Sequence, residues 1–168
     1  MDLNLIELLM MEHSSLRLRF RVMRETKDYD SIYEMEEFVR SCHAKIEDEI
    51  VFPKLRGVLS SEGFAEVTGA LSRLEADHKL IDAIGEQIKL RTSSGELETL
   101  RKRISLYCTT VETHNTAEET LVFQHWKKLD SAGERAASSS ARKIVEDFGL
   151  ARYFQITGIS QELFEQLE

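Results

Sequence analysis

One motif occurs twice in this sequence, and its two copies decide the fold. Residues 43–55 read HAKIEDEIVFPKL, and residues 114–126 read HNTAEETLVFQHW. In each copy a histidine is followed four positions later by a glutamate, and then by an apolar run that ends in phenylalanine. Residues i and i+4 lie on one face of a helix, about 5–6 Å apart, so each copy can offer an imidazole and a carboxylate to one centre. The repeat therefore predicts two helices that carry equivalent half-sites.

Long stretches without helix breakers surround both copies. The chain has only one proline and eight glycines in 168 residues, and in four stretches the apolar residues step by three and four, as in the seam of a packed bundle. Breaks are expected near residues 27–30, 60–63 and 92–95, where Asp, Ser and Gly can cap and turn the chain. Pro53 should kink or end the second helix near Glu49. The pattern predicts an all-α fold, an up-down-up-down four-helix bundle over residues 1–130.

Every predicted seam contains a histidine. In the first, Ile6, Leu9, His13, Leu16, Phe20 and Met23 follow one another by steps of three and four. Short connections make neighbouring helices antiparallel, so residues equally far from a break lie at the same level of the bundle. Counted in this way, the four seam histidines lie at about one level, with two glutamates one turn beyond. The candidate metal ligands are His13, His43, Glu47, His78, His114 and Glu118.

Buried glutamates need a compensating positive charge, because an unpaired charge in a protein interior is costly. No lysine or arginine occupies these seam positions, which leaves metal as the simplest compensation. Imidazole and carboxylate ligands without thiolate favour iron or manganese, and two carboxylates that can bridge favour a pair of ions. Cys42 and Cys108 show no C-x-x-C spacing, so neither a disulfide framework nor a thiolate zinc site is expected.

Four segments together resemble a known family. MEH at 11–13, HAKIEDEIVFP at 43–53, EADH at 75–78 and HNTAEETLVF at 114–123 are similar to the hemerythrin-like, or HHE, cation-binding domain, over roughly residues 5–130. The resemblance implies a four-helix bundle with two iron ions, bridged by oxo or hydroxo groups and by carboxylates, with manganese or zinc as the alternatives. It implies that the six candidate residues are the ligands, and that the small ligand is oxygen, nitric oxide or peroxide.

The third and fourth segments depart from the oxygen-carrying members of that family. Leu74 and Asp82 flank His78 where the carriers have a second histidine, and the fourth segment has H-x-x-x-E instead of H-x-x-x-x-D. The chain is thus more similar to bacterial and archaeal HHE proteins, which include proteins proposed to repair iron–sulfur centres. Glu75, Asp82 or Glu119 could complete the coordination, although Asp48, Glu49 and Glu119 are expected mainly on solvated faces.

Three functions remain open at this point. The first is a di-iron protein that binds or senses oxygen, nitric oxide or iron and redox state. The second is a di-iron oxidoreductase that acts on peroxide or nitric oxide, or an iron donor for iron–sulfur repair. The third is an interaction scaffold that carries zinc or no metal.

Charge and hydropathy narrow the partners. The formal net charge of −8 argues against nucleic acid and anionic membrane surfaces, which need basic patches. No run of 18 apolar residues is long enough for a membrane span, and the acidic start does not resemble a signal peptide. A reducing cytoplasm is the expected location.

Residues 131–168 form a tail that the repeat does not explain. The serines at 138–140, with Gly149 and Gly158, are expected to break it into two helices. Its apolar residues are too few for a separate core, so the tail should pack on the bundle or on a second subunit in a homodimer. His125 shares the fourth seam, but it is about 10.5 Å along the helix axis from Glu118, too far for the same ions.

Overall fold

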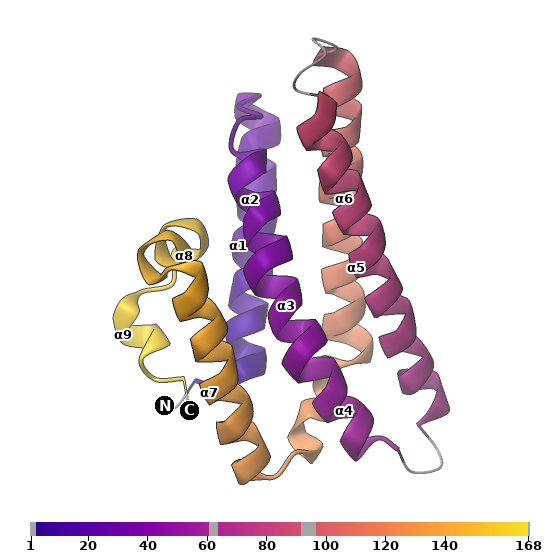
Figure 1. Cartoon of the computed structure of the whole chain (residues 1–168), viewed down its shortest axis with the longest axis vertical. Helices are drawn as coiled ribbons and strands as arrows, with labels where there is room; N and C mark the ends of the chain where they lie inside the picture. Colours follow the sequence, from indigo (N-terminus) through magenta and orange to yellow (C-terminus); the bar gives the residue numbers. More distant parts are fainter. Residues whose placement is uncertain (1–2, 61–63, 92–96, 168) are drawn as a thin grey trace.

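Four long helical segments run side by side in the computed structural model, which describes residues 3–60, 64–91 and 97–167 (Figure 1). The first is α1 (Leu5–Thr26), and the second runs without interruption from α2 to α4. The third is α5 (Ala65–Arg91) and the fourth is α6 (Leu97–Leu121). Successive segments run in opposite directions, which confirms the predicted up-down-up-down arrangement of an all-α chain.

Local hydrogen bonds fix where α1 begins and ends. The Asn4 side chain accepts from the backbone N–H of Glu7 at 2.9 Å, and the Glu7 carboxylate accepts from the backbone N–H of Asn4 at 3.0 Å. This reciprocal pair satisfies two of the donors that a helix start leaves free. Lys27, with φ of 59°, ends the helix in the left-handed conformation, so the break predicted near residues 27–30 is confirmed.

The other two predicted breaks fall mainly outside the described residues. Helix α4 ends at Val58 and α5 begins at Ala65. Helix α5 ends at Arg91 and α6 begins at Leu97.

The second helical segment changes its hydrogen-bond register twice. It consists of α2 (Ile32–Phe38), a π-helical turn η1 (Val39–His43), α3 (Ala44–Ile46), a second π-helical turn η2 (Glu47–Val51) and α4 (Phe52–Val58). In each π-turn a backbone N–H donates to the carbonyl five residues earlier, from Ala44 to Val39 and from Phe52 to Glu47.

Pro53 therefore does not end the helix near Glu49. A proline inside a regular α-helix clashes with the carbonyl four residues earlier. The wider turn of η2 lies just before Pro53 and lets the helix continue to Val58. The two π-turns contain His43 and Glu47, and such turns often occur at functional sites.

The faces expected to be buried are buried along most of their length, but Leu97 and Leu121, near the two ends of the fourth predicted seam, are 55% and 44% exposed. All six members of the first predicted seam have at most 8% exposure, and the third and fourth seams contribute Leu71, Leu74, Ile81, Ile104 and Val111 to the same core. The histidines lie inside this apolar core rather than at its edge, so the site is surrounded by aliphatic and aromatic side chains along the bundle axis.

A short 3-10 helix, η3 (Phe123–Lys128), follows α6, and the tail begins with α7 (Ser131–Phe148). Helix α7 lies along α1 and the second helical segment (Figure 1). The serine run does not break it, because the Ser140 hydroxyl donates to the Ala136 carbonyl at 2.9 Å within the helix, and Ser138 is buried. The break predicted at the serines is therefore wrong, whereas Gly149, with φ of 108°, does end α7.

Two shorter helices complete the chain. Helix α8 (Leu150–Thr157) contacts α1 and α2, and Gly158, with φ of 69°, ends it in the left-handed conformation. Helix α9 (Gln161–Phe164) follows, and the Leu3 N–H donates to the Gln166 carbonyl at 3.0 Å. No helix in the described part of the chain is both long enough and apolar enough to cross a membrane.

Candidate metal centre

All six predicted ligand residues meet in the interior of the bundle. None of them exposes more than 7% of its surface. They form two overlapping groups, and within each group the potential ligand atoms lie within 4.8 Å of one another. We call these groups the His13 position and the His78 position. The His13 position consists of His13, His43, Glu47 and Glu118, and the His78 position consists of Glu47, His78, His114 and Glu118.

The Glu47 carboxylate divides its two oxygens between the positions. Its Oε1 is 3.3 Å from His43 Nε2 and 3.6 Å from His13 Nε2. Its Oε2 is 3.2 Å from His78 Nε2. One carboxylate from η2 thus faces imidazoles from three different helices.

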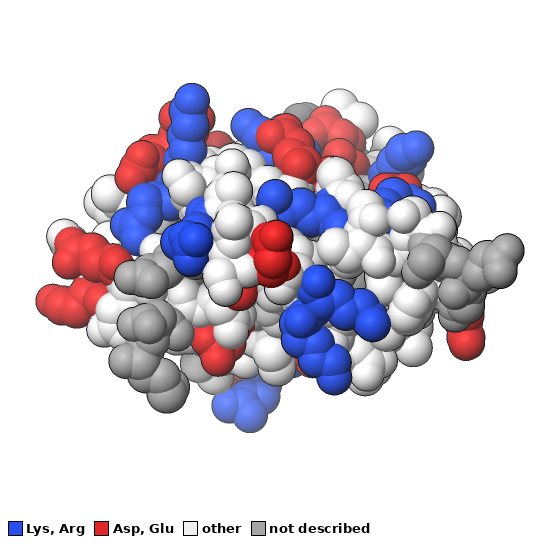
Figure 2. All heavy atoms as spheres, turned by 90° about the horizontal axis from the view of Figure 1, so that it is seen from below, with Lys and Arg blue, Asp and Glu red and all other residues white. Residues whose placement is uncertain are grey.

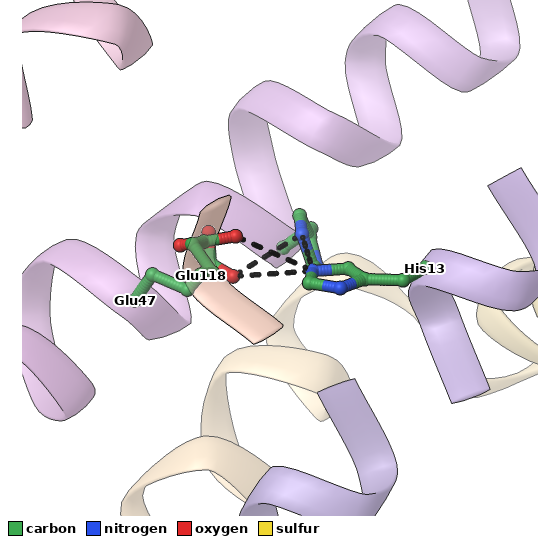
Figure 3. A group of neighbouring side chains, drawn as sticks. His13, Glu47 and Glu118 are labelled. Carbon is green, nitrogen blue, oxygen red and sulfur yellow. Dashed lines mark hydrogen bonds and ion pairs between the residues drawn. The ribbon is translucent and has the colours of Figure 1, made fainter. Parts of the chain in front are cut away.

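The Glu118 carboxylate, from α6, also divides its two oxygens between the two positions. Its Oε2 is 3.4 Å from His13 Nε2, and its Oε1 is 3.4 Å from His114 Nε2. Figure 3 shows the carboxylates of Glu47 and Glu118 directed at the His13 ring. Two carboxylates that each present one oxygen to either position have the arrangement of bridging ligands.

The donor atoms have the spacing and the unmet bonding of a metal site. Both oxygens of Glu47 and of Glu118, and the Nε2 atoms of His78 and His114, are buried without a hydrogen-bond partner among the described residues. Ligand bonds of about 2.0–2.2 Å place neighbouring ligands of one ion about 2.8–3.6 Å apart. The observed separations of 3.2 to 3.6 Å fall in that range, so these residues fit a pair of cations.

Each imidazole turns its other nitrogen toward an acid of a neighbouring helix. His43 Nδ1 lies 2.7 Å from Glu12 Oε2, and His78 Nδ1 lies 2.8 Å from Asp48 Oδ1. These are hydrogen-bond distances. In the first pair the acid comes from α1 and the histidine from the second helical segment. In the second pair the acid comes from the second helical segment and the histidine from α5.

The other two histidines continue the same order. His114 Nδ1 is 3.7 Å from Asp77 Oδ2, so α5 faces α6 at ion-pair distance. His13 Nδ1 is 2.8 Å from Glu119 Oε1, so α6 serves α1. The four contacts form a closed ring around the bundle, and we call Glu12, Asp48, Asp77 and Glu119 the outer acids.

The outer acids determine which ring nitrogen is free for a metal. At His13, His43 and His78 the carboxylate accepts a hydrogen bond from Nδ1, which favours the tautomer with the proton on Nδ1 and leaves the lone pair on Nε2. Asp77, at 3.7 Å from His114 Nδ1, acts on the fourth imidazole only through its charge. All four Nε2 atoms point to the centre, as the contacts with Glu47 and Glu118 show. The ring of outer acids therefore orients the imidazoles and makes them more basic ligands.

Without metal, two of the histidines hold protons strongly. Burial lowers the pKa of His13, but the carboxylates of Glu119, Glu47 and Glu118 outweigh it and raise this pKa to about 9. Burial likewise lowers the pKa of His78, whereas Asp48 and Glu47 raise it to about 10. In the metal-free protein, protonated histidines thus supply part of the positive charge that the buried acids require.

The acids show the complementary behaviour. Burial raises the pKa of Glu47, but the neighbouring histidines His43, His13 and His78 hold it well below its usual range. Burial and the charge of Glu47 raise the pKa of Glu118. The hydrogen bond from His13 lowers the pKa of Glu119 to about 2, with Arg17 at 2.8 Å adding to the effect.

The outer acids are the residues that reasoning from the sequence missed. Asp48 and Glu119 were expected mainly on solvated faces, and the side chain of Asp48 is 44% exposed, but each also contacts a ligand histidine. The repeat could have indicated these two acids, because an acid directly follows the ligand glutamate in both copies. A second signal lies in Glu12 and Asp77, which directly precede His13 and His78. The two halves of the bundle thus share one pattern of acids as well as one pattern of ligands.

The remaining candidates lie outside the two positions. Glu75 pairs with Arg56 at 2.7 Å on the surface, and the His125 ring lies against Phe64 with centroids 5.9 Å apart. Cys42 and Cys108 are free and buried, and burial raises the pKa of both thiols, that of Cys108 to about 12. Both therefore remain protonated and apolar in character.

One side of the centre approaches the surface. A pocket of about 190 Å³ lies between the second helical segment and α5, and its lining includes Lys45, Asp48, His78 and Asp82. His78 is 7% exposed, whereas His13 is fully buried. The His78 position is therefore the one closer to solvent.

Fold and site together define a class of protein: a four-helix bundle with a buried site of histidines and bridging glutamates for two metal ions. The family model described as Hemerythrin HHE cation binding domain matches residues 4–126. This match covers most of the chain, and the protein belongs to the hemerythrin HHE cation-binding family. No curated protein and no solved structure gave a match.

Proposed function

We propose that this chain holds two iron ions at the His13 and His78 positions and uses them to bind or sense a small ligand, such as oxygen or nitric oxide, or to report iron and redox state. The observation that carries the proposal is the pair of buried carboxylates, Glu47 and Glu118, with one oxygen directed at each histidine pair. Imidazole and carboxylate donors without thiolate suit iron better than softer metals. In the alternatives with manganese or zinc, the same six residues would be the ligands.

The chain's own residues would contribute three things to such a centre. The outer acids hold the imidazoles with Nε2 inward. The surrounding apolar side chains exclude bulk water, which strengthens the electrostatic interactions inside. Iron, when bound, supplies reversible coordination of a small ligand and a change of oxidation state. The pocket beside His78 offers such a ligand an approach from the surface.

Metal content and an optical spectrum test the identity of the metal. Protein purified without chelator after iron-replete growth should contain about two iron ions per chain. An oxidised iron pair with shared carboxylate ligands absorbs in the near ultraviolet and visible, whereas zinc does not. Stoichiometric zinc, or no metal, would contradict the iron proposal and favour an interaction scaffold.

A di-iron oxidoreductase acting on peroxide or nitric oxide, or an iron donor for iron–sulfur repair, is the second candidate. The approach to His78 from the surface favours it, because turnover requires exchange at the centre. Anaerobic loading with ferrous iron, followed by rapid mixing with oxygen, peroxide or nitric oxide, separates the two. A persistent spectral change indicates binding, and consumption of many equivalents indicates catalysis.

Two further properties belong to the proposal. The free, buried cysteines fit a reducing cytoplasm. The acidic surface fits a partner that is neither nucleic acid nor membrane, and Figure 2 shows basic side chains interspersed with acidic ones on the end of the bundle seen from below. Because the tail contacts its own bundle, a homodimer through the tail requires apolar surface beyond these contacts, and the mass in solution tests it.

A further inference from the structure

A tyrosine outside the family match reaches the metal centre through one intermediate residue. The Tyr153 hydroxyl of α8 donates to Glu12 Oε1 at 2.5 Å, and the other oxygen of that carboxylate, Oε2, accepts from His43 Nδ1 at 2.7 Å. All three side chains are at most 2% exposed. Burial, and then the charge of Glu12, raise the pKa of Tyr153 well above its usual range, so the phenol remains the donor.

The position of Tyr153 is fixed from several sides. Its ring lies against Phe38, Phe154 and Phe164, with centroids 5.5 to 6.0 Å apart. Along α1, Ser15 and Arg19 follow Glu12 at spacings of three and four, so they lie on the same face, and they donate to carbonyls at the end of α8. Helix α8 is therefore docked on α1 by a row of polar contacts that ends at the centre.

Among the residues that the structure describes, the other half of the bundle has no equivalent contact. By the internal repeat, Asp77 corresponds to Glu12 and His114 corresponds to His43. Yet the side chain of Asp77 is 45% exposed, and its Oδ2 lies 3.7 Å from His114 Nδ1, beyond hydrogen-bond distance. The tail therefore braces one histidine of the His13 position and leaves its counterpart in the His78 position unbraced.

We propose that Tyr153 is a positioning residue that, by holding Glu12 against His43, makes the His13 position the tighter of the two metal positions. The His78 position, beside the pocket, is then the one that exchanges its ion more easily. This inference rests on the proposed function only in requiring that two cations bind, and not on their being iron. It assigns the C-terminal extension a part in metal affinity.

Titration of the metal-free full chain with Fe²⁺ alone, by anaerobic calorimetry, tests the inference. We expect two ions to bind in two resolved steps. Tyr153→Phe keeps the ring and its packing but removes the hydroxyl. Because Tyr153 acts on His43 through Glu12, the variant should weaken the first step by about tenfold, the lower end of the effect of losing an outer contact to a ligand, with the second step unchanged. Glu12→Gln, which replaces the carboxylate by an amide, should weaken the first step at least as much.

The matched control is Tyr107→Phe. Tyr107 is also a fully buried tyrosine, but its hydroxyl has no hydrogen-bond partner among the described residues. Both affinities should stay as in the wild type. Equal affinities for the two ions in the wild type, an unchanged first step in Tyr153→Phe, or an equal loss in both steps would overturn the inference.

A second measurement needs no variant. Because coupling between two sites is reciprocal, metal loading must also stabilise the docking of α8. Hydrogen exchange of the amides in Leu150–Thr157 should slow when Fe²⁺ binds, and unchanged exchange there would contradict the coupling. Failure of the wild type to bind two metal ions would instead refute the proposed function, so the two failures are distinguishable.

Discussion

The two buried glutamates are the residues on which the centre depends most. Each has both carboxylate oxygens inside the bundle, without a hydrogen-bond partner among the described residues. A buried carboxylate in that state is costly unless a cation or a proton compensates it.

Removal of either glutamate should lower the metal content. Glu47→Ala or Glu118→Ala takes away one ligand of both positions, so bound iron should fall from about two ions per chain toward one or none. His125→Ala should leave it near two, because that ring lies against Phe64 and in neither position. Metal analysis of the three purified variants decides, and the reverse pattern would mean that the ligand assignment is wrong.

The metal-free protein should lose stability as the pH rises. The pKa values of His13 and His78 are raised to about 9 and about 10, against about 6.5 in an unfolded chain. Between these values the unfolded state binds fewer protons than the folded state, so the free energy of unfolding falls with pH. The stabilising contribution is fully present below about pH 6.5 and is lost above the folded-state pKa values.

Urea unfolding with chelator present, at about pH 6.5, 8 and 10, measures this effect. The midpoint should decrease over that series. Because metal must displace the same protons, iron affinity should rise over the same range. A midpoint that stays constant or increases would contradict the charge balance described for the centre.

The sequence predicted more about the ligands than about their supports. Ligand residues interrupt an apolar seam, so periodicity exposes them. The outer acids lie on the shoulders of the helices, where Asp48 and Glu119 resemble any solvated acid until the neighbouring helix is placed. The contact of Tyr153 with Glu12 could not be predicted for the same reason, because nothing in the sequence around Tyr153 indicates which helix it contacts.

Among the helical elements, the second long segment departs most from regular geometry. Its buried Glu36, at the end of α2, lies between Arg40 at 3.2 Å and Lys89 at 2.7 Å. Gly85 of α5 faces it, and a Cβ there would come within 2.9 Å of the Glu36 side chain. The glycine thus allows α5 to pass close to a carboxylate that is already paired.

Gly85→Ala should destabilise the protein by about 1–3 kcal/mol, as overpacking of a filled interior does. Gly69→Ala is the matched control in the same helix, because its Cβ would meet only the flexible end of Arg73, at 3.6 Å. That change should instead stabilise by about 0.5–1 kcal/mol through helix propensity. Chemical denaturation compares the two, and equal effects would refute the close approach.

Element type was readable from the sequence, but hydrogen-bond register was not. Apolar steps of three and four gave the long helices. They could not reveal the π-turns η1 and η2, because one extra residue in a turn leaves the local pattern almost unchanged. The serines at 138–140 suggested a break from composition alone, whereas burial of Ser138 keeps that part of α7 helical.

For the whole molecule, metal should act as a stabilising ligand. An ion that binds only the folded state adds about 2.7 kcal/mol at a free concentration of a hundred times its Kd. For a chain of this length, that corresponds to a rise in Tm of roughly 5–10 °C per ion. Calorimetric scans of chelator-treated and iron-loaded protein check this, and equal melting temperatures would contradict a buried site.

The closed ring of outer acids has a consequence for assembly. Each acid faces the imidazole of the following helix, and the last faces the first. Each metal position also takes one glutamate from the other helical hairpin, so neither hairpin contains a complete position. A half-built bundle would offer misaligned imidazoles and would release its ions. Only a completely folded chain would then retain its metal, so metal content would report the fraction of chains that have finished folding.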